Sequence, residues 1–267
     1  MGLSTRSLWG PEGRWAEIVR EMLLSKNYFL PTINGRVYFD KPLLSYWVIL
    51  PFSLLTGGIT ELTTRLPSAI FGLGTVLITY KIGMHLFSKR SSIISAWILA
   101  SSFMFIFWSK TASAETMNMF MVWLALWIYL SRKISHKPIY AIIFYITLAI
   151  SAFCKGLVAP FLVIFSLLFT NLFESILNVK KTGFSYKIFF KCVSLETEWL
   201  FSSNSAKGIV AGLIVFFLFL FTPVMVTGLW ESVELMWREN FLRFFKPFDH
   251  IEPFYVYLKY IPFFIAP

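Results

Sequence analysis

The chain of 267 residues is 57% apolar and only 14% charged, and 19% of its residues are Phe, Trp or Tyr. An ordinary soluble domain is about half apolar and a quarter charged, and soluble surfaces avoid the large apolar patches that this composition requires. The net charge is +10, from 24 Lys and Arg against 14 Asp and Glu. Composition excludes a soluble enzyme, a nucleic-acid-binding module and a disordered tail, and indicates a polytopic helical membrane protein.

Residues 11–25 predict a short amphipathic helix. Pro11 suits the first helical position and Glu12 the first turn. One face of this helix carries Trp15, Ile18, Val19, Met22 and Leu23, and another carries Arg14, Glu17 and Glu21. Because an apolar face led by Trp belongs in the headgroup layer of a membrane, we expect the helix to lie at the interface.

Residues 42–58 form a further apolar stretch, broken by Pro51 and by Gly57-Gly58. We interpret this stretch as a helix that lies on the interface or dips into it, and a true span is the alternative. Residues 1–66 are thus predicted to form one external loop with interfacial helices.

Six longer apolar segments predict membrane-spanning helices at 67–87, 92–108, 116–131, 139–154, 156–173 and 208–230. The start of another span is predicted at 254–267, and a cytosolic loop at 174–207. The predicted fold class is therefore all-α, a polytopic transmembrane helical bundle over residues 67–267. Because no span precedes the external loop and the last span stops at Pro267, we expect the bundle to be incomplete at both ends.

The charges orient this array. With residues 1–66 outside, the inner face collects eleven Lys and Arg against three acids, and the outer face collects thirteen against eleven. This bias agrees with the excess of Lys and Arg in cytoplasmic loops.

Polar residues gather on the predicted outer side. They include Glu12, Arg14, Tyr38, Asp40, Lys41, Lys110, Glu115, Lys155 and His250. Charges at a membrane boundary are costly unless they are paired or hydrated, so these residues are candidates for function. Lys26, Arg36 and Arg65 are instead expected to be solvated or to face lipid headgroups.

Carboxylates and cations near one leaflet suit transfer from a lipid-linked phosphate donor. The donor needs cations because negative charge builds on its phosphate, and Arg14, Lys41 or Lys155 could supply them. A hydroxyl acceptor needs a carboxylate base, which could be Glu12, Asp40 or Glu115. Plain structural roles remain open: either Glu could simply begin its helix, Lys155 could reach toward the interface, and Asp40 could pair with Lys41.

The order of these motifs resembles that of a known family. The sequence resembles the GT-C membrane glycosyltransferases, most specifically in the first external loop, at Trp9 to Leu23 and Leu30 to Pro42. Later motifs follow in the family's order: Arg65-Leu-Pro-Ser-Ala, Lys110 with Glu115, Cys154-Lys155-Gly156, and His250 to Tyr257. Within this family, the sequence resembles the bacterial aminoarabinose (lipid A) transferases and their protein-mannosyltransferase-like relatives. The resemblance covers nearly the whole chain.

The resemblance implies an inverting glycosyltransferase in the cytoplasmic (inner) membrane, with an active site that faces the periplasm or exterior. Its donor would be a polyprenyl-phosphate sugar and its acceptor a lipid, glycan or protein. Glu12 would be the essential carboxylate, with Asp40 or Glu115 assisting, although Pro11 stands where the family has a first acid. Donor phosphate contacts would be Arg14, Tyr38, Lys41 and Lys155. No cofactor is required; Asp40 and His250 match positions that hold a divalent metal in some relatives.

Two alternatives stay open from the sequence. A transporter or flippase for a lipid-linked substrate would also be an apolar helical bundle, although transporters favour repeated halves around a midplane site. An inactive transferase fragment is the other alternative.

Overall fold

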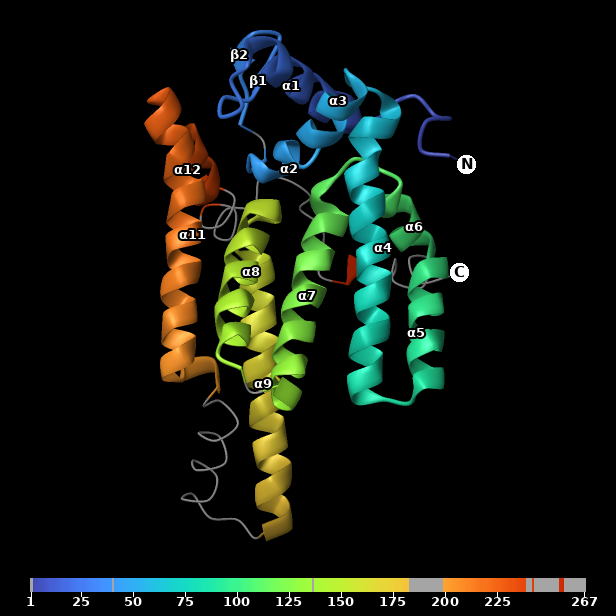
Figure 1. Cartoon of the computed structure of the whole chain (residues 1–267), viewed down its shortest axis with the longest axis vertical. Coiled ribbons are helices and arrows are strands. Elements are labelled where there is room, and N and C mark those ends of the chain that lie inside the picture. The colour runs from blue at the N-terminus through green and yellow to red at the C-terminus, as the bar shows by residue number, and fades with distance from the viewer. Residues whose placement is uncertain are drawn as a thin grey trace.

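The computed structural model describes residues 2–39, 41–135, 137–182 and 199–238, together with 242, 255 and 256. A cap of short elements covers one end of a bundle of long, roughly aligned helices (Figure 1). The cap consists of α1 (Glu12–Ser25), β1 (Thr32–Ile33), β2 (Arg36–Val37), α2 (Leu44–Trp47) and α3 (Leu50–Thr56). The remaining helices are α4 (Glu61–Leu86), α5 (Lys89–Ser101), α6 (Phe103–Ser109), α7 (Ala114–Ser135), α8 (Ile139–Lys155), α9 (Val158–Thr182), α11 (Ser203–Thr227) and α12 (Glu231–Trp237). The described part confirms the all-α helical class.

Each of the six predicted spans coincides with a helix or a helix pair. Within the described residues, α4, α9 up to Leu177, and α11 are long and apolar enough to cross a membrane, and the pair α5 and α6 makes a possible fourth crossing. Helix α8 is apolar but shorter, at 17 residues. It packs between α7 and α11, and α7 packs in turn on α4.

The segment predicted as one span at 92–108 is bent. Helices α5 and α6 meet at an angle of 66°, with Ser102 in an extended conformation between them. The hydroxyls of Ser101 and Ser102 both donate to the carbonyl oxygen of Ile98, at 3.2 and 2.7 Å. These serines replace regular backbone bonding with side-chain bonding, which is a common cause of helix kinks.

Several helix ends differ from the predicted boundaries because Ser and Thr cap them. Thr60 accepts a hydrogen bond from the Thr63 amide, so α4 begins at Glu61 rather than at residue 67. Ser202 caps α11 in the same way, and α9 continues to Thr182. The predicted cytosolic loop at 174–207 is therefore helical at both its ends, and residues 183–198 lie outside the described residues.

The predicted outer segments meet at the cap. Ser45 of α2 donates to the carbonyl oxygen of Cys154 at the end of α8, at 3.3 Å. The amide of Ala112, which precedes α7, donates to Glu12 of α1 at 2.8 Å. At the far end of the bundle, Ser131 of α7 lies 3.3 Å from His85 of α4. Segments predicted to share a side of the membrane therefore share an end of the bundle.

The amphipathic helix is confirmed, but its partner is protein rather than lipid. Trp15, Ile18, Val19 and Met22 are buried in one core with Tyr46. This burial arises because residues 42–56 fold back as two short helices, α2 and α3, and cover the apolar face. Neither helix is long enough by itself to span a membrane, and the interfacial position of 42–58 stays a prediction.

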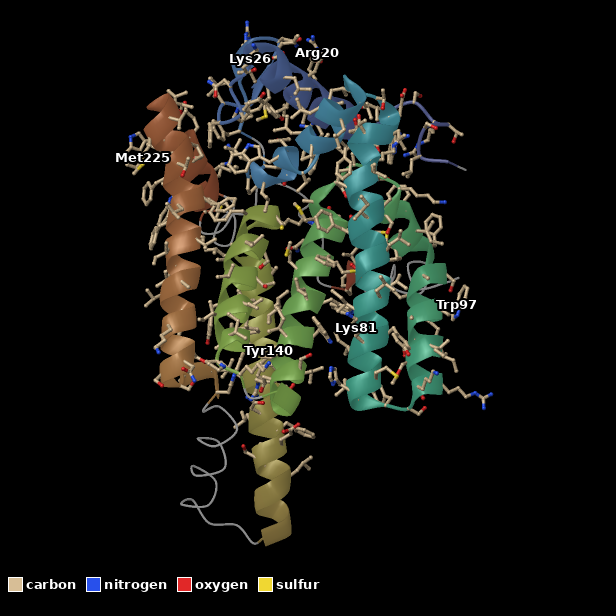
Figure 2. The ribbon with its side chains drawn as sticks, in the orientation of Figure 1. Arg20, Lys26, Lys81, Trp97, Tyr140 and Met225 are labelled. Carbon is tan, nitrogen blue, oxygen red and sulfur yellow. The ribbon has the colours of Figure 1, made fainter. Side chains whose placement is uncertain are left out.

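The outward faces of the bundle helices are apolar. Trp97 is 71% exposed and Met225 is 84% exposed, and both side chains project away from the bundle (Figure 2). Further exposed apolar residues are Leu73, Leu77, Phe161, Phe165, Phe169 and Leu218. Such a continuous apolar surface matches the hydrocarbon interior of a bilayer.

Helices α8 and α11 approach each other closely through two glycines of α11. A Cβ atom at Gly208 would lie 2.6 Å from the carbonyl oxygen of Ala141, and one at Gly212 would lie 2.8 Å from that of Tyr145. The spacing of these glycines is the small-xxx-small pattern that lets membrane helices approach. Because the obstructing atoms are backbone, side chains cannot relieve the overlap.

We expect Gly212→Ala to separate α8 from α11 and to lower the free energy of unfolding by about 1–3 kcal/mol, as overpacking does. Thermal unfolding in detergent measures this loss. The matched control is Gly13→Ala, because a Cβ at Gly13 meets no atom within 4 Å. Equal unfolding temperatures for the two variants would contradict the close approach.

Candidate active site

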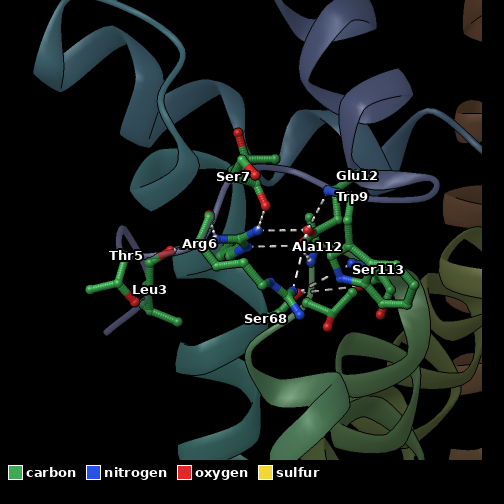
Figure 3. A network of polar contacts seen from close by, with 12 residues as sticks. Leu3, Thr5, Arg6, Ser7, Trp9, Glu12, Ser68, Ala112 and Ser113 are labelled. Atoms are coloured by element: carbon green, nitrogen blue, oxygen red, sulfur yellow. Dashed lines mark hydrogen bonds and ion pairs between the residues drawn. The ribbon is translucent and has the colours of Figure 1, made fainter. Parts of the chain in front are cut away.

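The carboxylate of Glu12 is buried at the base of the cap. It is 0% exposed and forms a two-point ion pair with Arg65 of α4, which is 1% exposed. Arg65 Nε donates to Glu12 Oε1 at 2.8 Å, and Arg65 Nη2 donates to Glu12 Oε2 at 2.7 Å. The carboxylate also accepts the backbone amides of Ala112 and Trp9, at 2.8 and 3.2 Å (Figure 3).

The guanidinium of Arg65 has all five of its N–H groups occupied. Two bond Glu12, and the other three reach backbone carbonyl oxygens of the segment before α1. Those acceptors are Leu3 at 2.7 Å, Arg6 at 2.6 Å and Ser7 at 3.0 Å (Figure 3). The expectation that Arg65 is solvated or faces headgroups is therefore wrong. The first turns of α4 lie under the cap, and the buried carboxylate supplies the countercharge that a buried guanidinium needs.

Burial by itself would raise the pKa of the Glu12 carboxyl. The hydrogen bonds from Arg65, Ala112 and Trp9 and the positive charge of Arg65 outweigh that cost, so the pKa of Glu12 lies below its ordinary value of 4.5. Glu12 is consequently ionised at neutral pH, and both of its carboxylate oxygens accept hydrogen bonds.

The lowered pKa of Glu12 predicts an acid-sensitive cap. A depressed pKa contributes stability that is present above the unfolded-state value and is lost as the pH falls through the folded-state value. We expect the unfolding temperature to decrease once the pH drops below about 4.5. Glu12→Gln should be less stable at pH 7, by about 3 kcal/mol, because it leaves Arg65 without its countercharge. Thermal unfolding between pH 3 and 7 tests this, and an equal pH response in both proteins would contradict it.

Glu115 and Lys155 form a second ion pair at the capped end of the bundle. Glu115 stands in the first turn of α7 and Lys155 is the last residue of α8. Lys155 Nζ lies 2.7 Å from Glu115 Oε2, and the two side chains are 49% and 28% exposed. Unlike Glu12, the Glu115 side chain is partly exposed, although its Oε2 atom is buried. Sequence reasoning selected both residues, and the structure brings them together.

Arg14 and Tyr38 are also in contact, on the outer surface of the cap. Arg14 Nη1 donates to the Tyr38 hydroxyl at 2.7 Å. Tyr38 directly follows the hairpin of β1 and β2, whose turn at Asn34-Gly35 has positive φ angles of 52° and 72°. Lys41 is partly buried and precedes α2. The predicted cations thus lie on the cap and at its base.

Two predicted site residues, Asp40 and His250, lie outside the described residues. The metal site assigned to them stays a prediction. Among the residues that the structure does describe, no three His, Cys, Asp or Glu side chains gather closely enough to hold a metal ion.

The sequence profile of a protein family described as "Dolichyl-phosphate-mannose-protein mannosyltransferase" matches residues 40–199. The chain belongs to this family. Among curated relatives, the undecaprenyl phosphate-alpha-4-amino-4-deoxy-L-arabinose arabinosyl transferase of Wigglesworthia glossinidia brevipalpis is 28% identical over 67% of this chain and 33% of its own length. The relative from Sodalis glossinidius that carries the same name with the number 2 is 36% identical over 46% of this chain and 22% of its own length. This mannosyltransferase-family chain thus spans about a third or less of these relatives.

Solved structures show the same fold. ArnT from Cupriavidus metallidurans superimposes with a TM-score of 0.69 in the apo state and 0.75 when bound to undecaprenyl phosphate. In both cases the sequence identity is 19%, and the match covers 98% of this chain and 45% of that one. The family member described here therefore has the polytopic helical fold that the sequence predicts.

Sequence reasoning missed Arg65 as part of the site. The available signal was its position beside a long apolar segment, where an unpaired charge is costly. The Asn34-Gly35 dipeptide, a strong hairpin signal, was likewise available for the turn that precedes Tyr38.

Proposed function

We propose that this chain carries the donor-binding end of an integral-membrane glycosyltransferase that acts on the outer side of the cytoplasmic membrane. The donor is a sugar linked to a polyprenyl phosphate, and the acceptor is a lipid, glycan or protein hydroxyl. Family membership and the names of the relatives support this class. The observation that carries the proposal is the partly exposed Lys155–Glu115 pair, which sets a cation beside a carboxylate at the capped end of a membrane bundle.

Lys155 is proposed to bind the phosphate of the donor. The phosphodiester of the donor carries one negative charge, as a carboxylate does, and can replace Glu115 as the partner of the ammonium group. Arg14, Tyr38 and Lys41 are proposed as further contacts to the donor on the cap. Binding of the donor would then free the carboxylate of Glu115 beside the bound sugar.

We assign the role of base to Glu115 rather than to Glu12, because both oxygens of Glu12 already accept strong hydrogen bonds. Glu115 takes the proton of the acceptor hydroxyl as that oxygen attacks the anomeric carbon. The bond from the anomeric carbon to the phosphate oxygen breaks, and the polyprenyl phosphate leaves with the electron pair. Lys155 stabilises the negative charge on the leaving phosphate, and attack from the opposite face inverts the anomeric carbon.

The test uses proteoliposomes that contain this chain, undecaprenyl phosphate carrying radiolabelled 4-amino-4-deoxy-L-arabinose, and lipid A as acceptor. Transfer of label to lipid A is the expected result. Movement of the intact donor between leaflets, with no label on the acceptor, would show a transporter instead. Retention of all label on an unmoved donor would contradict both functions.

A further inference from the structure

Glu12 reaches beyond Arg65 to the chain segment that carries Glu115. Its Oε1 atom accepts the backbone amide of Ala112, which lies only three residues before Glu115. The same oxygen accepts Arg65 Nε, so one atom joins α1, α4 and the turn that enters α7 (Figure 3). A hydrogen bond from an amide to a buried carboxylate is short and directional, and it fixes the position of that turn.

The turn is held from a second direction by Ser68 of α4. Ser68 stands three residues after Arg65, on nearly the same face of the helix. Its hydroxyl lies 3.4 Å from both the amide nitrogen and the carbonyl oxygen of Ser113. The next residue, Ala114, is 3% exposed and packs in the core of the cap. The entrance to α7 is therefore fixed by α1, by α4 and by the cap core.

We propose that the Glu12–Arg65 pair is a positioning device that sets the place of Glu115 relative to Lys155. This inference rests on the proposed function, because it gives Glu12 a role in transfer without contact to the substrate. Arg65 fixes the orientation of the Glu12 carboxylate by bonding both of its oxygens, and Glu12 fixes the amide of Ala112. Glu115, at the second position of α7, then meets the ammonium group at the end of α8.

The charge and shape of both partners are needed for this role. Arg65 bonds both carboxylate oxygens at once, which a lysine cannot do because its ammonium group is a single point charge. A glutamine at position 12 keeps an acceptor for Ala112 but replaces the other oxygen with a donor that faces Arg65. We therefore expect Glu12→Gln and Arg65→Lys to loosen the entrance to α7.

The experiment measures transfer in single-turnover reactions for Glu12→Gln, for Glu115→Gln and for the double variant. If Glu12 acts through Glu115, Glu12→Gln slows transfer 10- to 100-fold in the unaltered chain and less than 3-fold in the Glu115→Gln background. Binding of undecaprenyl phosphate should change less than 3-fold. Equal losses in both backgrounds would show that Glu12 acts independently of Glu115, and would overturn the proposal.

A second measurement does not depend on activity. Hydrogen exchange of the peptide 109–118 should become at least 10-fold faster in Glu12→Gln. Ser68→Ala keeps the ion pair and should give a smaller increase, so it serves if Glu12→Gln does not fold. The matched control is Glu17→Gln, which removes an exposed ion pair with Arg20 from the same helix and should change neither exchange nor transfer. Unchanged exchange in both Glu12→Gln and Ser68→Ala would overturn the positioning role.

The two proposals fail in distinguishable ways. Absence of transfer by the unaltered chain contradicts the proposed function, and with it the catalytic purpose of the positioning. Transfer that is unaffected by Glu115→Gln contradicts the assignment of the base, and with it the catalytic purpose of the positioning, but not the transferase function. Transfer that needs Glu115 but is indifferent to Glu12→Gln contradicts the positioning alone.

Discussion

Glu115→Gln is expected to slow sugar transfer by about 10²–10⁴-fold, the usual contribution of a positioned general base. The amide cannot accept the acceptor's proton at neutral pH, although it keeps the size of the side chain. The rate is measured with saturating donor, so that any change in binding does not contribute. Donor binding should be retained or become tighter, because the carboxylate that competes with phosphate for Lys155 is removed.

The matched control for this variant is Glu61→Gln. Glu61 also stands in the first turn of a bundle helix at the capped end, and it interacts with its helix N-terminus in the same way. We expect Glu61→Gln to change transfer less than 3-fold. Comparable losses in the two variants would show that Glu115 matters only as a helix-terminal charge, and would contradict its role as base.

The second large effect concerns Lys155. Lys155→Met keeps the length of the side chain but removes its charge, so it deprives the phosphate of a charge-assisted hydrogen bond worth about 1.5–3 kcal/mol. This corresponds to about 10- to 150-fold weaker binding. Tryptophan fluorescence titrated with undecaprenyl phosphate measures the affinity.

Lys110→Met is the control for Lys155→Met. Lys110 is exposed and follows α6 at the same end of the bundle, so its loss changes the local charge by the same amount. We expect its effect on affinity to be less than 3-fold. If both variants weaken binding equally, the contribution of Lys155 is general electrostatic attraction rather than a specific phosphate contact.

Local patterns in the sequence predicted much of the fold. The apolar face of α1 and the six apolar segments follow from the spacing and length of apolar runs, which depend on neighbouring residues only. What covers the face of α1 could not be predicted in this way. Its partner, Tyr46, lies more than twenty positions away, and the choice between lipid and protein depends on how residues 42–56 fold.

In the candidate site, too, single residues could be predicted from local sequence, whereas contacts between distant residues could not. Glu115 and Lys155 were accessible to sequence reasoning because each interrupts or borders an apolar segment, where a charge is conspicuous. Glu12 and Arg65 were also visible as charges, but 53 positions separate them and no periodic pattern links them. Their pairing depends on how the cap docks on α4, and that docking decides whether Glu12 is an open base or a buried partner.

The bonds that Arg65 makes to Leu3, Arg6 and Ser7 end on main-chain oxygens. Every amino acid offers that oxygen, so side chains in this segment can vary among homologues without loss of these three bonds, apart from Arg6, whose own side chain lies 3.5 Å from Glu12. An insertion or deletion there would instead carry the oxygens out of register with the guanidinium. In an alignment, the segment should therefore diverge in composition at Leu3 and Ser7 while its length stays constant, and Arg65 should covary with Glu12.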